Sequence, residues 1–198
     1  NSKHRAALHQ SADPTSANRP LRILQVITDA DRRGAQVFAV DLAGELTHRG
    51  HAVTTVALAP GTTGATLGVH ALGHTARGPQ TLRALRRAMA EADVTVAHGS
   101  STLLACCVAG AGPGRPFVYR QISDSRFWAA SATRRARVSA YLHFPAHVVA
   151  LSASAASTLS EYLGLSPQRI TVVPNGVPAE PFMSPQTTAD AQIGRAHV

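Results

Sequence analysis

Short apolar runs alternate with longer amphipathic segments through most of the chain. The apolar runs have the length of strands and lie at residues 21–28, 53–58, 94–97, 117–121, 147–151 and 170–173, with a shorter one at 69–73. The segments between them have a helical period, as where Phe38, Leu42 and Leu46 recur every four residues and Gly50 follows. Strands that alternate with helices predict βαβ units and a parallel sheet.

Helices are expected in the intervals, at residues 35–50, 79–92, 102–110, 125–144 and 153–164, of which 125–144 is the longest. Pro79 favours the first turn of its helix, and Ser152 stands where the N-cap of the last helix belongs. The strands at 94–97 and 147–151 do not alternate polar and apolar residues, which indicates helices on both faces of the sheet. The predicted fold is an α/β, Rossmann-like, doubly wound parallel sheet.

The chain has 198 residues, of which 44% are hydrophobic, and this is enough for one buried core. No apolar run reaches the roughly 20 residues of a membrane span. Residues 1–20 are expected to be a disordered lead-in, and the protein is expected to be cytoplasmic. Cys106 and Cys107 are adjacent in an apolar helical segment, so we expect small buried residues there and not a metal or redox motif.

The formal net charge of +8 raises the hypothesis of a nucleic-acid binder. The arginines are spread over many segments and aromatic residues make up only 5% of the chain, so we expect no nucleic-acid partner. The basic helical segments RALRR and RRARVSAYLHF are either solvated faces or surfaces that attract anionic lipid. The second alternative would place the protein peripherally on the inner face of the membrane.

Small, polar or titratable residues follow most of the predicted strands. They are Asp29, then His98, Gly99 and Ser100, then Arg120, Ser123 and Asp124, then Ser152, and finally Asn175 and Gly176. Because the carboxyl ends of parallel strands meet at one edge of a sheet, we expect these residues to lie along a single rim where a ligand binds.

Three of these positions suggest a chemistry, each with a plain structural alternative. Gly34 and the backbone of Ala35 begin a helix and can offer N–H groups to a phosphate, unless the loop is an ordinary turn. His98 is a candidate general acid or base, or a hydrogen-bond donor to a sugar hydroxyl, unless it is structural. Asn175-Gly176 predicts a sharp turn after a strand. The dinucleotide, P-loop, nucleophile-elbow and HExxH patterns do not fit, and no metal is expected.

Four segments in order resemble the N-terminal half of GT-B fold glycosyltransferases of the family 4-like group. They are RILQVITDADRRGAQVFAVDLAGELTHRGHAVTTVAL, DVTVAHGSSTL, RPFVYRQISDSRFW and HVVALSASAASTLSEYLGLSPQRITVVPNGV. The resemblance covers residues 21–182, and VVALSASAASTL with ITVVPNGV is its most specific part. It implies the acceptor-side domain of a retaining enzyme that transfers a sugar from a nucleotide-diphosphate sugar to a glycan or lipid-linked acceptor, with no metal or other cofactor.

The resemblance also assigns roles by position. Gly34 corresponds to the remaining glycine of the family's Gly-Gly-Ala-Glu turn, which approaches the donor diphosphate together with the backbone of Ala35. Arg33 stands in place of the other glycine and Gln36 in place of the glutamate. Asp29 and Arg33 are therefore expected to line the cleft beside that turn.

The next two strands carry the expected catalytic and cleft-lining residues. His98 and Gly99 correspond to the end of the family's His-Ala-His-Gly-like strand, which lines the cleft. Many members place a histidine near the acceptor and the transferred sugar after the following strand, where this chain has Arg120, Ser123 and Asp124. We expect His98 and Asp124 to be catalytic and the others to line the acceptor side.

Asn175 and Gly176 match the family's turn at the boundary between two domains. Residues 183–192 are accordingly expected to begin a linker to a donor-binding domain, without which the chain is expected to be inactive. Residues 193–198, IGRAHV, correspond to the translation of a common sequencing adapter and are expected not to be native. A nonenzymatic Rossmann-like binding module is the alternative, and an epimerase of related architecture would need an acidic, histidine-rich site.

Overall fold

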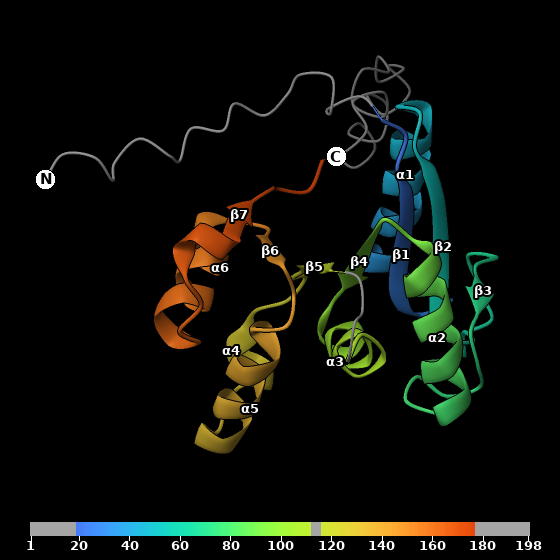
Figure 1. The fold of residues 1–198 in the computed structure, drawn as a ribbon. Coiled ribbons are helices and arrows are strands. Elements are labelled where there is room, and N and C mark those ends of the chain that lie inside the picture. The colour runs from blue at the N-terminus through green and yellow to red at the C-terminus, as the bar shows by residue number, and fades with distance from the viewer. Residues whose placement is uncertain (1–18, 112–115, 177–198) are drawn as a thin grey trace, which may run out of the picture.

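The computed structural model describes residues 19–111 and 116–176 (Figure 1). Most of the expected lead-in at residues 1–20, and all of the expected linker and adapter-derived residues, lie outside this part of the chain. The described residues form a seven-stranded, all-parallel sheet with the strand order β3-β2-β1-β4-β5-β6-β7. The predicted α/β fold with a parallel sheet is confirmed.

Each predicted apolar run forms a strand. The strands are β1 (Arg22–Asp29), β2 (Ala52–Ala59), β3 (His70–Ala71), β4 (Val94–His98), β5 (Phe117–Arg120), β6 (His147–Ala150) and β7 (Ile170–Val172). The helices are α1 (Gly34–His48), α2 (Pro79–Glu91), α3 (Ser100–Ala109), α4 (Ser125–Trp128), α5 (Ala132–Leu142) and α6 (Ala153–Ser157). A π-helical turn (Thr158–Tyr162) extends α6, and a 3₁₀ turn (Pro167–Arg169) precedes β7.

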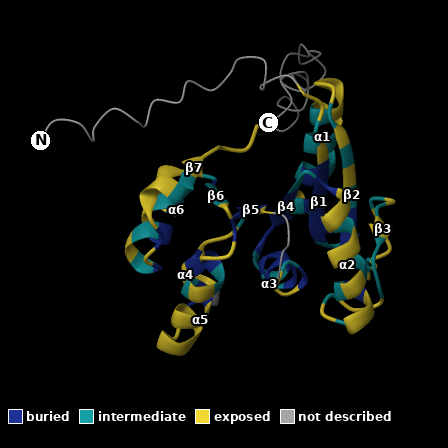
Figure 2. Ribbon diagram, viewed as in Figure 1, coloured by how far each residue is buried: buried dark blue, intermediate teal, exposed yellow. Residues whose placement is uncertain are grey.

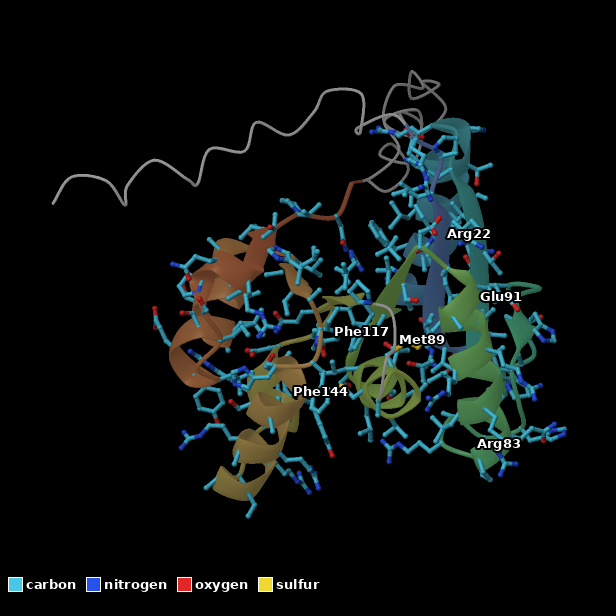
Figure 3. All side chains as sticks on the ribbon, in the orientation of Figure 1. Arg22, Arg83, Met89, Glu91, Phe117 and Phe144 are labelled. Atoms are coloured by element: carbon cyan, nitrogen blue, oxygen red, sulfur yellow. The ribbon has the colours of Figure 1, made fainter. Side chains whose placement is uncertain are left out.

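Helices pack on both faces of the sheet, as predicted, but unequally. The larger core cluster lies between one face and the helices α2, α3 and α5 with the turn after α6, and Met89 of α2 and Phe117 of β5 lie in this layer (Figure 3). The smaller cluster, which includes Ile27 and Ala39, lies under α1 on the other face. Buried residues are concentrated in β1, β4 and α3, whereas β7 and the outer side of α5 are exposed (Figure 2).

The prediction of one long helix at residues 125–144 is wrong, because the segment forms two helices, each with its own N-terminal cap. Asp124 caps α4 by accepting a hydrogen bond from the backbone N–H of Arg126 at 2.9 Å. Ser131 then caps α5 by accepting one from the N–H of Arg134 at 3.3 Å. Local side-chain acceptors of this kind stop one helix and start the next even where helical propensity is continuous. The predicted cap at Ser152 is confirmed.

The predicted burial of the two cysteines is also confirmed. Cys106 and Cys107 lie on α3 with 0% and 5% of their surface exposed. Burial raises the pKa of both thiols, that of Cys107 to about 12. Both side chains are therefore protonated, apolar members of the larger core.

Strand register determines which side chains share the α1 face. Gln25 of β1 pairs with Val96 of β4, and His98, two residues further along β4, pairs with Arg120 of β5. Since alternate residues of a strand point to the same face, Gln25, His98 and Arg120 lie on one face, under α1. His98 and Arg120 stand at the carboxyl ends of β4 and β5, and Gln25 lies in the middle of the adjacent strand β1. The chain changes direction across the sheet between β1 and β4, next to these residues.

Candidate functional site

A buried hydrogen-bond chain connects α1 to the end of β4 through Gln25. Its side-chain Nε2 donates to the carbonyl oxygen of Ala39 at 2.9 Å. Its Oε1 is 2.8 Å from Nε2 of His98. An amide oxygen can only accept, so Nε2 of His98 carries the proton and donates it to Gln25. The chain of bonds fixes both the orientation and the tautomer of the imidazole.

The other ring nitrogen of His98 has no partner among the described residues, although the side chain is only 2% exposed. Burial, followed by the charge of Arg120, lowers the pKa of His98 to about 3. The imidazole is therefore neutral at pH 7, and its bare Nδ1 is a buried hydrogen-bond acceptor. This environment does not suit a general acid or a donor to a sugar hydroxyl, which were among the expected roles; it suits an acceptor from a ligand hydroxyl.

Arg120 is a buried cation beside that histidine, with 5% of its surface exposed. Its guanidinium carbon lies 3.7 Å from the centroid of the Phe38 ring on α1. Its Nη2 donates to Oδ1 of Asn175, which brings the turn after β7 to the end of β5. Burial lowers the pKa of Arg120 to about 10, so the group stays charged at neutral pH. Arg120, His98 and Asn175 are thus brought together, as the sequence predicted.

The entrance to α1 combines a salt bridge with free helical N–H groups. Arg33 pairs with Asp29 at the end of β1, and Gln36 donates to Oδ1 of the same aspartate at 3.1 Å. Gly34 and Ala35 begin the helix, where N–H groups have no preceding turn to bond. A Cβ built on Gly34 would meet nothing within 4 Å, so this glycine leaves open space at the helix start and is not required by packing.

A cavity of about 230 Å³ lies between the loops that follow β5 and β6. It is lined by Gln121, Ile122, Ser123, Asp124, Leu151, Ser152, Ser154, Ala155 and Thr158. The predicted residues Ser123, Asp124 and Ser152 are thus brought together. Asp124 and Ser152 each use one oxygen as a helix cap. Gln121 donates to the carbonyl of Ser123 and the hydroxyl of Ser125, and its Oε1 is a buried acceptor without a partner among the described residues.

Ser100 does not join these residues, whereas Gly99 holds the neighbouring strands together. Ser100 is the first residue of α3 and lines a different cavity, with Arg77 and Tyr141. Gly99 has φ +90° and ψ 172°, a conformation that glycine alone adopts easily, and its N–H donates to the carbonyl of Arg120 at 3.0 Å. Gly176 is exposed at the end of the described chain.

The sequence reasoning missed three residues of this region, whereas Gln121 was among the polar residues noted after its strand. Gln25 is an uncharged glutamine in an apolar strand, which is the one signal that marked it. Phe38 was assigned only to a helix face. Asp31, 4% exposed, accepts from the N–H groups of Thr62 at 2.7 Å and of Thr63, and the Thr63 N–H holds its pKa below the ordinary value. It ties the loops after β1 and β2 together.

The family model described as Glycosyltransferase Family 4 matches residues 32–181. No curated protein matches the chain at a significant level. In the described part of the chain, no helix has the length and apolar character needed to cross a membrane, and no group of three or more His, Cys, Asp or Glu residues could hold a metal ion.

Several solved structures share the fold at low sequence identity. HepE of Anabaena, in complex with UDP and glucose, is 17% identical with a TM-score of 0.65, over 81% of this chain and 46% of that one. A glycosyltransferase from Rickettsia africae is 17% identical with a TM-score of 0.54, over 83% and 45%. UDP-N-acetylglucosamine 2-epimerase from Rickettsia bellii is 12% identical with a TM-score of 0.55, over 79% and 45%. The chain spans less than half the length of each.

Proposed function

Because the chain belongs to glycosyltransferase family 4, we propose that it is the acceptor-side part of an enzyme that transfers a sugar from a nucleotide-diphosphate sugar to an acceptor with retention of configuration. The observation that carries this proposal is the family match, which runs from residue 32, before α1, to residue 181, beyond β7, and so includes the candidate site residues that follow β1. A nucleotide-sugar donor is supported by the complex of HepE with UDP-glucose.

The start of α1 is the proposed contact with the donor diphosphate. The N–H groups of Gly34 and Ala35 carry the partial positive charge of a helix N-terminus, and the open space at Gly34 allows a phosphate to approach the backbone. The salt bridge between Arg33 and Asp29 keeps the arginine beside this entrance.

The cavity between the loops after β5 and β6 is the proposed acceptor side. Ser123, Asp124 and Ser152 present hydroxyl and carboxylate oxygens there, which suits a hydroxylated acceptor such as a glycan. Asp124 uses Oδ1 for its cap and keeps a second oxygen for the reacting groups. His98 would act near the transferred sugar by accepting a hydrogen bond through Nδ1, not by transferring a proton.

The proposal is tested with the full-length gene product that contains this chain, called the complete protein below. We expect that protein to transfer sugar from a nucleotide-diphosphate sugar, and the 198-residue chain to show no turnover because charge at the leaving group is stabilised mainly from a second domain. No turnover with any donor by the complete protein would favour a nonenzymatic binding module. Interconversion of the donor sugar without transfer would favour an epimerase.

A matched pair of glycine variants tests the donor contact. Gly34 and Gly44 both lie on α1, and an added Cβ would meet nothing within 4 Å at either position. In the complete protein, Gly34→Ala should raise the KM for the donor by about tenfold, because the methyl group blocks the backbone N–H groups. Gly44→Ala should leave it unchanged. Equal KM values for the two variants would remove the donor role of Gly34.

Peripheral contact with anionic membrane is a further part of the proposal. The segment from α4 to residue 144, just after α5, exposes Phe127 at 84% and Phe144 at 59% of their surface. The same segment has exposed arginines at positions 126, 134, 135 and 137. Aromatic side chains with arginines suit the boundary between anionic head groups and acyl chains. A solvated basic face is the alternative.

Vesicle co-sedimentation distinguishes these two alternatives. The chain should bind vesicles that contain anionic lipid more strongly than neutral vesicles, and Phe127→Ser should weaken the binding. Arg49→Gln removes an exposed arginine at the end of α1 and should have little effect. Equal binding to anionic and neutral vesicles would leave the arginines as a solvated face.

A further inference from the structure

Among the described residues, Arg120 has no carboxylate to balance its charge. The ion pairs of the described residues involve Asp93, Asp29 and Glu45, and none of them includes Arg120. Only burial acts on its pKa, which a neighbouring carboxylate would raise. A charged group 5% exposed is normally paired, because removal of water from an unpaired charge is unfavourable.

The contacts that Arg120 does make fix its guanidinium plane without using all of its donors. The ring of Phe38 holds one flat face at 3.7 Å, and Asn175 takes one hydrogen bond from Nη2. Four of the five N–H donors of the guanidinium, on Nε, Nη1 and Nη2, have no acceptor among residues 19–111 and 116–176. Nη2 belongs to both forks of a guanidinium, Nη1–Nη2 and Nε–Nη2, so its second N–H leaves one fork with the geometry that binds two oxygens of a phosphate or carboxylate.

The neighbouring side chain, His98, has a hydrogen-bond acceptor without a donor, whereas Arg120 has donors without acceptors. His98 is the register partner of Arg120 on β4, on the same face of the sheet, and its Nδ1 is a buried acceptor without a donor in the part of the chain that the structure describes. The Gln25 hydrogen bond prevents the ring from turning its N–H toward Arg120. A ligand that satisfies both groups has an anionic oxygen and a hydroxyl close together, as a sugar attached to a phosphate does.

We propose that Arg120 anchors an oxyanion subsite at the carboxyl ends of β4 and β5, which binds a phosphoryl group of a substrate while Nδ1 of His98 accepts a hydrogen bond from an adjacent hydroxyl. The inference rests on the proposed glycosyltransferase function for the nature of the substrate. The phosphoryl group is either the diphosphate of the donor or a phosphate of the acceptor. Arg120 is then a binding residue, in addition to its contact with the turn at Asn175.

Thermal unfolding of the 198-residue chain with added anions tests the subsite. Pyrophosphate should raise Tm by several degrees relative to KCl of equal ionic strength, because a ligand that binds only the folded state stabilises it. Arg120→Met should weaken pyrophosphate binding by about tenfold or more, and Arg120→Lys should weaken it less, since lysine keeps the charge but loses the two-nitrogen fork.

Arg169→Met is the matched control. Arg169 is also partly buried, but its Nη2 donates to the carbonyls of His143 and Pro145 and so has a structural role only. This variant should bind pyrophosphate like the wild type even if its Tm is lower. Should Arg120→Met fail to fold, ³¹P NMR titration of wild type against Arg120→Lys gives the same comparison. Absence of a pyrophosphate-specific shift in the wild type, or wild-type binding by both Arg120 variants, would overturn the proposal.

Further ligands identify the source of the phosphoryl group. Binding of UDP and pyrophosphate without binding of glycerol 1-phosphate assigns the donor diphosphate, whereas equal binding of glycerol 1-phosphate and inorganic phosphate assigns an acceptor phosphate. The subsite and the proposed function can fail separately. If the complete protein lacks transferase activity but binds anions through Arg120, only the proposed function is rejected. If Arg120→Met transfers sugar with an unchanged KM, only the subsite is rejected.

Discussion

Replacement of Gln25 by leucine should destabilise the fold measurably, although the two side chains have similar volume. The variant loses the bonds to His98 and Ala39. The Ala39 carbonyl still accepts the helical hydrogen bond from the next turn of α1, so the loss of its bond from Gln25 lowers the stability only slightly. The imidazole N–H of His98 is left buried and unpaired, which costs about 1–3 kcal/mol. The apolar gain of leucine offsets about 1 kcal/mol of this loss, so we expect a net loss of up to about 2 kcal/mol.

Urea unfolding followed by circular dichroism measures this loss, provided that the slope with denaturant is unchanged. The control is Gln168→Leu at an exposed position, which should stay within about 0.5 kcal/mol of wild type. A second variant, Gln25→Glu, places a carboxyl group against the imidazole and should raise the pKa of His98 above its value of about 3, as seen by NMR titration. If Gln25→Leu matches the control and Gln25→Glu leaves the His98 pKa unchanged, the hydrogen-bond chain does not exist in solution.

Three further predictions concern the same edge of the sheet. Gly99→Ala should lower the free energy of unfolding by about 1–3 kcal/mol, because φ +90° with ψ 172° suits glycine alone. Gly44→Ala should not lower it. Urea unfolding of both variants tests this difference. The folded pKa of His98 lies below its ordinary 6.5, so the unfolded state binds more protons between about pH 3 and 6.5. Stability should therefore fall as the pH is lowered from about 6.5 to about 3, by up to about 1.4 kcal/mol per pH unit, and His98→Leu should show a shallower slope. Ser152→Ala should cost about 1 kcal/mol through loss of the α6 cap, and an unchanged urea midpoint would contradict that role.

The sequence was sufficient for the strands and for the rim of the site, because both depend on local pattern. Apolar runs bounded by turn residues located every strand, and the residues that follow those strands necessarily share an edge of a parallel sheet. The helix at 125–144 was wrong because the caps at Asp124 and Ser131 depend on backbone direction, which composition does not specify.

The partners of the site residues could not be predicted, because they depend on strand register and on where α1 lies. The tautomer of His98 could not be inferred until the register placed Gln25 close to it. Arg120 looked like a cleft-lining residue until α1 placed the ring of Phe38 against its guanidinium. Each of these contacts joins positions that are distant in the chain, and no local periodicity encodes them.

The burial of the two thiols on α3 gives the protein a chemical reporter of its own motions. Cys106 and Cys107 are the chain's two cysteines, and neither is accessible to a modifying reagent in the folded state. The rate of alkylation therefore measures how often α3 separates from the core. A cysteine introduced at an exposed position can be labelled selectively while α3 stays closed, so a fluorescent or spin probe can be attached without removal of the native thiols.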